Sequence, residues 1–85
     1  MLYSIQFTSR ASKDFIALPQ SIQLRFEEKI EGLSKNPKPQ GVQKLKGEEH
    51  LYRIRVGDYR LVYKIRDSIL LILILKIGHR KEIYR

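Results

Sequence analysis

The chain has 85 residues, enough for one small domain spanning 1–85 with a modest core. A composition of 42% hydrophobic and 31% charged residues argues against disorder, and the lack of cysteine excludes disulfides and thiolate metal sites, which fits a cytoplasmic location. The net charge of +8 is uneven: residues 44–85 carry eleven basic and five acidic residues, so we expect a polyanion to bind this half. No membrane association is expected, because the longest apolar run, Ile69–Leu75, is far shorter than the roughly 20 residues of a membrane span.

The first half of the chain predicts a strand followed by a helical hairpin. Tyr3, Ile5 and Phe7 alternate with polar residues, as in a half-buried strand. Thr8 or Ser9 can cap a first helix, which Pro19 ends. The residues that share one face of the two helices are Ala11, Phe15 and Leu18 in the first and Ile22, Phe26, Ile30 and Leu33 in the second. The proline-rich segment 36–41 then predicts a loop.

Three strands are expected in the second half. Gly57-Asp58 joins 51–56 to 59–66, and Asp67-Ser68 joins 59–66 to 69–77. If both turns have two residues, the facing pairs are Arg55 with Arg60, Arg53 with Val62, Arg60 with Leu75 and Tyr63 with Ile72. We therefore predict an α+β fold with a four-stranded, fully antiparallel sheet in the order 1-4-3-2 and the helical hairpin packed on one face.

This register assigns the side chains of the last three strands to two faces. The helix-covered face takes Tyr52, Ile54, Val56, Leu61, Tyr63, Ile65, Leu70, Ile72 and Ile74. The open face takes Arg53, Arg55, Arg60, Lys64 and Arg66 beside Leu71, Leu73 and Leu75. The tail from Gly78 leaves the end of the sheet where Arg55 and Arg60 lie, so we expect His79, Arg80 and Tyr84 to fold back beside them.

Arginines that face each other across a ladder repel, and an absent anionic ligand would explain that cost. Guanidinium groups match phosphate oxygens and would stabilise a pentacoordinate transition state. His50 and His79 lack the spacing of a zinc site, and neither a carboxylate cluster for magnesium nor a phosphate-binding glycine loop is present, so we expect no metal and no cofactor. RNA supplies its own nucleophile, the 2′-hydroxyl. The alternative is a solvated basic face without function.

The order strand, helical hairpin, three strands, together with KLKG, YRIRVGDYRLVY and the ending GHRKEIYR, resembles the RelE/ParE toxin superfamily and most closely its RelE branch. The resemblance covers essentially the whole chain. It implies a ribosome-dependent endonuclease that cleaves messenger RNA in the A site by attack of the 2′-hydroxyl on the adjacent phosphate. It also implies a cognate RelB-like antitoxin, with operator DNA bound only through the antitoxin complex.

By position, the resemblance makes Arg53, Arg55, Arg60, Arg80 and Tyr84 the candidate catalytic residues. Arg53 and Arg55 stand where the best-studied RelE toxins have lysines, and arginine hardly ever exchanges a proton. Arg53 and Arg55 should therefore bind RNA and stabilise charge, which leaves proton transfer to Tyr84 or to His79, with no choice between them. His79 could equally be a turn residue, and Tyr84 could serve packing.

Lys44, Lys46 and Lys64 are candidate RNA contacts, although solvated lysines are the more common case. The alternative function is that of the ParE branch, which shares the fold: a non-nucleolytic toxin that inhibits DNA gyrase. The arginines of the hairpin and the GHR…Tyr ending favour the nuclease.

Overall fold

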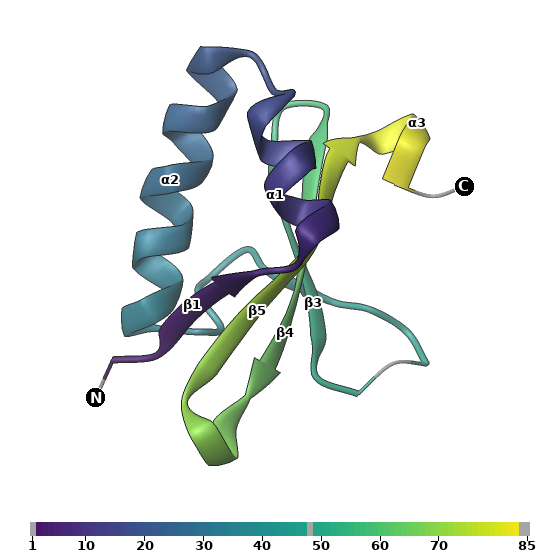
Figure 1. Cartoon of the computed structure of the whole chain (residues 1–85). Helices are drawn as coiled ribbons and strands as arrows, with labels where there is room; N and C mark the ends of the chain where they lie inside the picture. Colours follow the sequence, from purple (N-terminus) through teal and green to yellow (C-terminus); the bar gives the residue numbers. More distant parts are fainter. Residues whose placement is uncertain (1, 48, 84–85) are drawn as a thin grey trace.

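A helical hairpin packs against one face of a five-stranded sheet (Figure 1). This computed structural model describes residues 2–47 and 49–83. The elements are β1 (Ser4–Phe7), α1 (Ser9–Ile16), α2 (Gln20–Lys35), β2 (Gln43–Lys44), β3 (Leu51–Val56), β4 (Tyr59–Arg66), the 3-10 turn η1 (Asp67–Ile69), β5 (Leu71–His79) and α3 (Arg80–Ile83). Within the described part of the chain, no helix is both long and apolar enough to span a membrane.

The helical hairpin begins where the sequence predicts, but α1 ends at Ile16, before Pro19, so that Leu18 lies in the turn. The Thr8 hydroxyl caps α1 by accepting a hydrogen bond from the Ala11 N–H at 3.0 Å, and it donates to the Leu75 carbonyl at 2.8 Å. Pro19 is the residue before α2, and the Gln23 side chain donates to carbonyl oxygens at the end of α1 and in the turn. These bonds satisfy backbone groups that the helix ends leave unpaired.

The prediction of a fully antiparallel sheet is wrong at one edge. The strand order is β1-β5-β4-β3-β2, and β1 runs parallel to β5, with Ser4 facing Leu71 and Phe7 facing Ile74. The two helices are unequal: α2 has 16 residues, about 24 Å of helix, whereas α1 has eight. The longer helix carries the chain back past the start of β1, where the Tyr3 N–H donates to the Ser34 carbonyl at 2.8 Å. The next long strand, β3, therefore starts at the same end as β1 and runs in the same direction.

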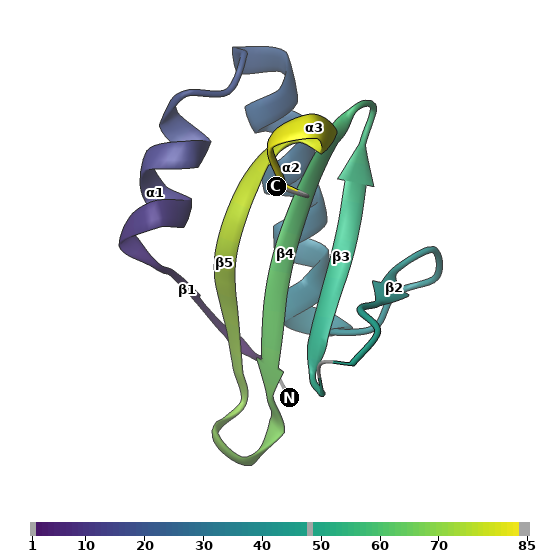
Figure 2. The same ribbon diagram turned by 90° about the vertical axis from the view of Figure 1, so that its right-hand side faces the viewer.

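A fifth strand lies at the opposite edge of the sheet. The short β2 pairs with β3, so that Gln43 faces Arg53 and Lys44 faces Tyr52 (Figure 2). The sequence predicts four strands and not this one, because the two residues of β2 are too few to show an alternating pattern. Since β2 covers only part of β3, the segment of β3 that leads to the hairpin remains at the edge.

The register of β3 with β4 confirms the predicted pairs, Arg55 with Arg60 and Arg53 with Val62. The register of β4 with β5 corrects the prediction, because Arg60 faces Gly78 instead of Leu75. One reason is the turn, in which η1 and a left-handed Leu70 (φ 51°) make the connection four residues long. The other is a bulge, which makes the register shift between Val62 and Tyr63.

The same two features also change other predicted positions. Tyr63 faces Ile74 instead of Ile72. Leu70 lies in the turn, not on the helix-covered face, and the bulge places Ile77 in the core. The other eight residues predicted for that face are buried there: Tyr52, Ile54, Val56, Leu61, Tyr63, Ile65, Ile72 and Ile74.

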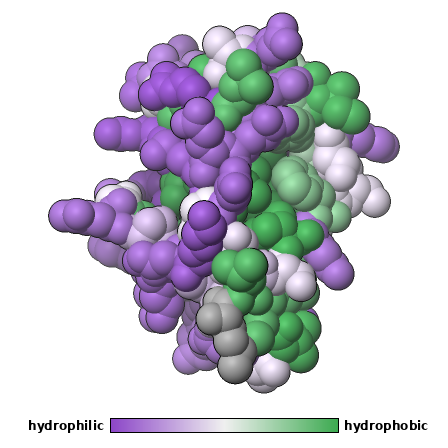
Figure 3. Space-filling model, turned by 90° about the vertical axis from the view of Figure 1, so that its left-hand side faces the viewer, coloured by the Kyte–Doolittle hydropathy of each residue, from purple (hydrophilic) through white to green (hydrophobic). Residues whose placement is uncertain are grey.

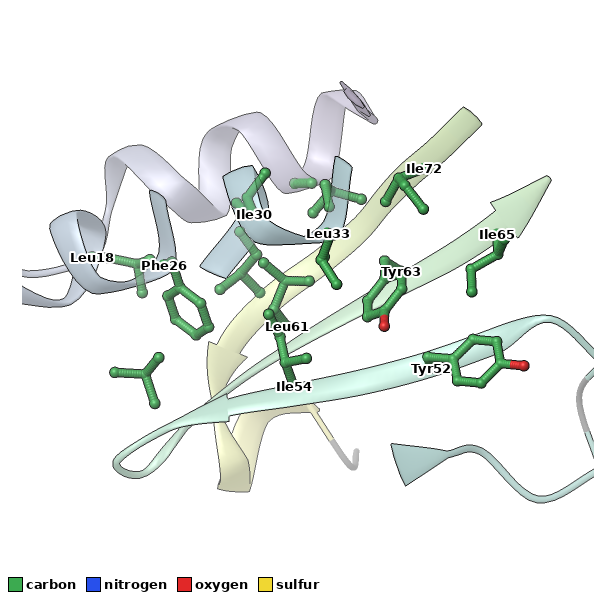
Figure 4. Packing of buried hydrophobic residues seen from close by; sticks show 14 residues of the cluster. Leu18, Phe26, Ile30, Leu33, Tyr52, Ile54, Leu61, Tyr63, Ile65 and Ile72 are labelled. Carbon is green, nitrogen blue, oxygen red and sulfur yellow. The ribbon is translucent and has the colours of Figure 1, made fainter. Parts of the chain in front are cut away.

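The core lies between the helical hairpin and the inner face of the sheet (Figure 4). Tyr52 and Tyr63 are both buried, as predicted, and their rings stack at 5.8 Å. The Tyr63 hydroxyl donates to the Pro37 carbonyl at 2.7 Å, so the core also holds the loop after α2. Burial, with a smaller contribution from Tyr52, raises the pKa of Tyr63 above its ordinary value, so this phenol remains a hydrogen-bond donor at neutral pH.

On the side of the molecule that carries α2, hydrophilic side chains cover one half of the view and hydrophobic side chains gather over much of the other half (Figure 3). The large apolar side chains exposed on the described surface are Leu2, Phe7, Ile16, Leu24 and Ile69. A mainly apolar groove of about 510 Å³ lies between β1, α1 and α2, and Glu27 and Glu31 are among its lining residues.

Candidate functional site

The turn between β3 and β4 positions two facing arginines. Gly57 has φ +58° and is the first of the two turn residues, as in a type II′ turn, while Asp58 has an ordinary negative φ. Because this turn has two residues, Arg55 at the end of β3 lies directly opposite Arg60 near the start of β4. The turn chemistry thus brings two like charges together.

Arg60 is covered rather than open, which corrects the expectation for this face. Its side chain is only 8% exposed, and it is the one buried charged residue in the described part of the chain. Its Nη1 donates to the carbonyl oxygens of Gly57 and Tyr59 at 3.2 and 3.3 Å. Arg60 is therefore held against its own turn, with its charge largely removed from water.

The outer face of the sheet is also covered next to Arg60. Val62 points to this face and is 2% exposed, although it lies outside the helix-covered core. The short helix α3 contacts β4 and β5. The tail from Gly78 predicts no further helix over the site, and α3 corrects that expectation. A one-turn helix of four residues is too short to give a periodic signal.

The tail returns to the hairpin, as the sequence analysis expected. On the β4–β5 ladder Arg60 faces Gly78 and Tyr59 faces His79. The Arg80 N–H then donates to the Asp58 carbonyl at 2.8 Å, which anchors the start of α3 to the β3–β4 turn (Figure 2). Arg80 itself is exposed, so its side chain is available to a ligand.

The four arginines influence one another electrostatically. The pKa of Arg60 is lowered from its ordinary value, first by burial and then by the positive charges of Arg55, Arg53 and Arg80, while Asp58 opposes this effect. Arginine nevertheless stays charged at neutral pH, so the site is a fixed cluster of cations. The structure thus brings Arg53, Arg55, Arg60 and Arg80 into one region.

A polar pocket of about 160 Å³ lies within this cluster, and we call it the arginine pocket. Its lining residues are Gly41, Gln43, Arg53, Arg55 and Arg60. The Arg53 guanidinium donates a short hydrogen bond to the Gln43 side chain, which orients it, while Arg55 is exposed. None of the lining residues is acidic, so the pocket suits an anion with several oxygen acceptors, such as a phosphate group.

Gly41 and Gln43 were missed by the sequence analysis. Both precede β3 by about ten residues and reach the pocket through the β2–β3 pairing, in which Gln43 faces Arg53. The turn residues of 36–41 and the polar Gln43 were visible in the sequence. Nothing in their pattern indicated a strand pairing, so no signal connected them with the arginines.

His79 lies beside the cluster but does not line the arginine pocket. Its ring meets Tyr59 edge to face, with centroids 5.7 Å apart, and its Nδ1 accepts a hydrogen bond from the Lys81 N–H at 3.3 Å. A neutral imidazole that accepts at Nδ1 carries its hydrogen on Nε2. Tyr84, the other candidate for proton transfer, lies outside the described residues.

None of the three candidate lysines lines the arginine pocket. Lys44 is exposed on β2 opposite Tyr52, and Lys46 is exposed in the loop that follows. Lys64 is partly buried on β4, four residues along the strand from Arg60, where it faces Leu51 and Leu73. The structure therefore gives these lysines no shared site with the arginines.

Comparison with known proteins identifies a matching family and similar toxins. Residues 5–84 match the family described as the ParE toxin of the type II toxin–antitoxin system, parDE. Toxin RelG of Mycobacterium tuberculosis is 35% identical over 100% of this chain and 99% of its own length. The mRNA interferase toxin RelE of Escherichia coli is 27% identical over 99% of this chain and 92% of its own length.

Solved structures agree with the sequence relatives. In the crystal structure of the archaeal RelE–RelB complex from Pyrococcus horikoshii, a chain that is 34% identical matches with a TM-score of 0.82 over 94% of this chain and 97% of that chain. The shared fold extends over both the sheet and the helical hairpin. The chain therefore belongs to the ParE family of type II toxins and is a toxin of the RelE type.

Proposed function

We propose that this toxin is an endoribonuclease that cuts messenger RNA in the A site of the translating ribosome and needs no cofactor. The observation that carries the proposal is the arginine pocket, in which Arg60 is held nearly buried among other cations. Burying a charge beside like charges is costly, and an RNA phosphate in the pocket would offset that cost.

The proposed reaction uses the nucleophile that RNA itself carries. The 2′-oxygen attacks the adjacent phosphorus while its proton passes to a base, and the bond from phosphorus to the 5′-oxygen of the next nucleotide breaks as that oxygen takes up a proton. The products are a 2′,3′-cyclic phosphate and a 5′-hydroxyl. Arg53, Arg55, Arg60 and Arg80 would stabilise the additional negative charge of the pentacoordinate transition state.

Proton transfer falls to His79 or Tyr84 in this proposal, because the arginines stay protonated. With Nδ1 accepting from Lys81, a neutral His79 carries its N–H at Nε2 and can donate a hydrogen bond to the leaving 5′-oxygen, whereas transfer of a proton to that oxygen requires the imidazolium form. Tyr84 is the alternative donor or base. The pH dependence of cleavage by His79→Gln and Tyr84→Phe separates the two residues, since the variant that lacks the titrating group should lose the corresponding limb of the profile.

A RelB-like antitoxin is the proposed partner, because RelE relatives are found in complexes with RelB. An antitoxin that covers the arginine pocket would relieve the same repulsion that RNA relieves, and operator DNA would be bound only through that complex. Lys44, Lys46 and Lys64 are proposed to contact RNA outside the arginine pocket. Action on translating ribosomes would place the toxin in the cytoplasm.

The test is primer extension on translated messages, with and without induction of the toxin. The proposal expects new 5′ ends within coding regions soon after induction, and their absence when translation is blocked beforehand. The second candidate is gyrase inhibition, which the match to the ParE family favours. Intact messages together with a DNA damage response would support that candidate and refute the nuclease.

A further inference from the structure

A second pocket adjoins the arginine pocket at the edge of β3. It has a volume of about 380 Å³ and lies between the C-terminal half of α2, the loop 39–42 and β3. Arg55 and Gly41 line both pockets, so the two spaces are neighbours that share one arginine. We call this second space the β3-edge pocket. Its size falls within the range of sites that hold small organic groups.

The lining of the β3-edge pocket combines apolar side chains with a few polar groups. Leu33, Val42 and Ile54 supply apolar surface, while Lys29, Gln40 and Arg55 supply hydrogen-bonding groups. None of the lining residues carries a carboxylate. The larger groove between α1 and α2 differs in this respect, since Glu27 and Glu31 line it and would repel a phosphodiester. Of these two spaces, the β3-edge pocket is the one suited to part of a nucleic acid.

We propose that the β3-edge pocket binds the unstacked base of a nucleotide whose phosphate occupies the arginine pocket. The inference rests on the proposed function and adds to it a subsite for RNA sequence or conformation. A base joined to a bound phosphate through one sugar must lie in a neighbouring space, and Arg55 stands between the two spaces. Its planar guanidinium can stack on a base while its positive charge still acts on the phosphate in the arginine pocket.

The hydrogen-bonding groups suit a base edge. The Gln40 amide offers both a donor and an acceptor, and Lys29 offers donors. Single-stranded RNA is recognised in this manner, with bases turned out of the stack and bound on their edges. Gln40 and Gly41 belong to the loop that the Tyr63 hydroxyl anchors through Pro37, so the core helps to position this wall.

Gly32 provides a substitution that fills the pocket without disturbing the core. It lies in α2, lines the β3-edge pocket, and a Cβ added at this position meets no atom within 4 Å. Gly32→Leu should therefore occupy the pocket, while the helix gains from the loss of a glycine. Gly32→Ala is the matched control, because it has the same effect on the helix but leaves most of the space open.

The experiment compares adenosine 5′-monophosphate with ribose 5-phosphate, which has the same phosphate and sugar but no base. The wild type should bind the nucleotide about tenfold more tightly, as expected for one stacked base. Gly32→Leu should abolish this difference and keep the affinity for ribose 5-phosphate, and Gly32→Ala should preserve most of the difference. Amide shifts of Gln40 and Val42 on adding the nucleotide should locate the base.

Equal affinities of the wild type for the two probes would overturn the inference, as would a base-dependent difference that survives Gly32→Leu. A lack of measurable nucleotide binding at millimolar concentration would also overturn it. Message cleavage is measured separately by primer extension. Cleavage with equal probe affinities would refute only the base subsite, whereas a base-dependent affinity without cleavage would refute only the nuclease.

Discussion

Replacing Arg60 with methionine should abolish RNA cleavage and leave the fold intact. Methionine keeps an unbranched stem of similar length, so it can fill most of the space that the 8% exposed arginine occupies. Alanine would be a poorer choice, because truncating a covered arginine removes packing as well as charge. Arg60→Met therefore isolates the charge.

The structure gives opposing contributions to stability. The variant loses two hydrogen bonds, to the Gly57 and Tyr59 carbonyls at 3.2 and 3.3 Å, each worth about 0.5–1.5 kcal/mol. It also loses the repulsion from Arg55 across the ladder, about 0.2–1 kcal/mol, and the cost of burying the charge. These contributions largely cancel, so the free energy of unfolding should change by less than about 1 kcal/mol, which shifts Tm by less than about 8 °C.

Activity should change far more than stability. A preorganised group that stabilises transition-state charge contributes about 10²-fold or more to the rate. We therefore expect cleavage of a translated message in a purified translation system to fall at least about 10²-fold in Arg60→Met. Phosphate should also raise the Tm of the wild type relative to chloride at equal ionic strength, and this increase should be missing in the variant.

Arg66→Met is the matched control. Arg66 lies on the same strand and the same outer face, but it is exposed and six residues from Arg60, about 20 Å along the strand. The control removes the same charge and should keep most of the cleavage. A folded Arg60→Met that cleaves at nearly the wild-type rate would refute the role of Arg60, and an equal loss in Arg66→Met would show that total charge matters rather than the pocket.

Substitutions at four further positions test other parts of the structure. Arg53→Lys and Arg55→Lys should retain most cleavage, whereas alanine at either position should not, since both residues act through charge; a collapse of both lysine variants in the same assay would show that guanidinium geometry is required. Tyr3→Phe should lower stability at neutral pH, because the Tyr3 hydroxyl donates to the carboxylate of Asp67 at 2.5 Å, and this bond raises the phenol pKa. Since the raised pKa belongs to the folded state, that stability is present below pH 10 and is lost as pH rises through the folded pKa, so urea unfolding curves of wild type and variant should converge at high pH. Tyr63→Phe should cost about 1–3 kcal/mol in the same measurement, because it leaves the Pro37 carbonyl in the loop without the part-buried hydrogen bond from the Tyr63 hydroxyl; an unchanged midpoint would mean that water replaces the hydroxyl.

The β3–β4 hairpin could be predicted from sequence because its turn has a single plausible length. Gly57-Asp58 between two alternating strands defines a two-residue connection, and the pairing of Arg55 with Arg60 follows by counting. The Asp67-Ser68 connection had the same appearance but a different length. A 3-10 turn that ends in a left-handed Leu70 extends it, and such a conformation is uncommon for a leucine. Local sequence therefore favoured the wrong register.

The parallel pairing of β1 could have been predicted from the sequence, because it follows from the unequal lengths of the two helices. Helices of eight and 16 residues cannot return the chain to the point where the first helix began, and the excess length of α2 reverses the expected strand direction. The bulge at Val62 and Tyr63 is different, because no residue in β4 or β5 marks it. The burial of the Arg60 side chain could not be predicted either, since it depends on how side chains from separate segments pack.

Packing of the core determines that the arginines of this protein lie close together. Side chains alternate along a strand, so the register that buries Leu61 and Tyr63 under the helices also turns Arg60 to the outer face, opposite Arg55. A slip of one residue would separate the arginines, but it would move the whole apolar set of the strand into water. Burial of two large side chains outweighs repulsion of about 1 kcal/mol or less between facing cations. Residues outside the arginine pocket thus hold its cations together, and under the proposed function these charges would already be in place for a phosphate.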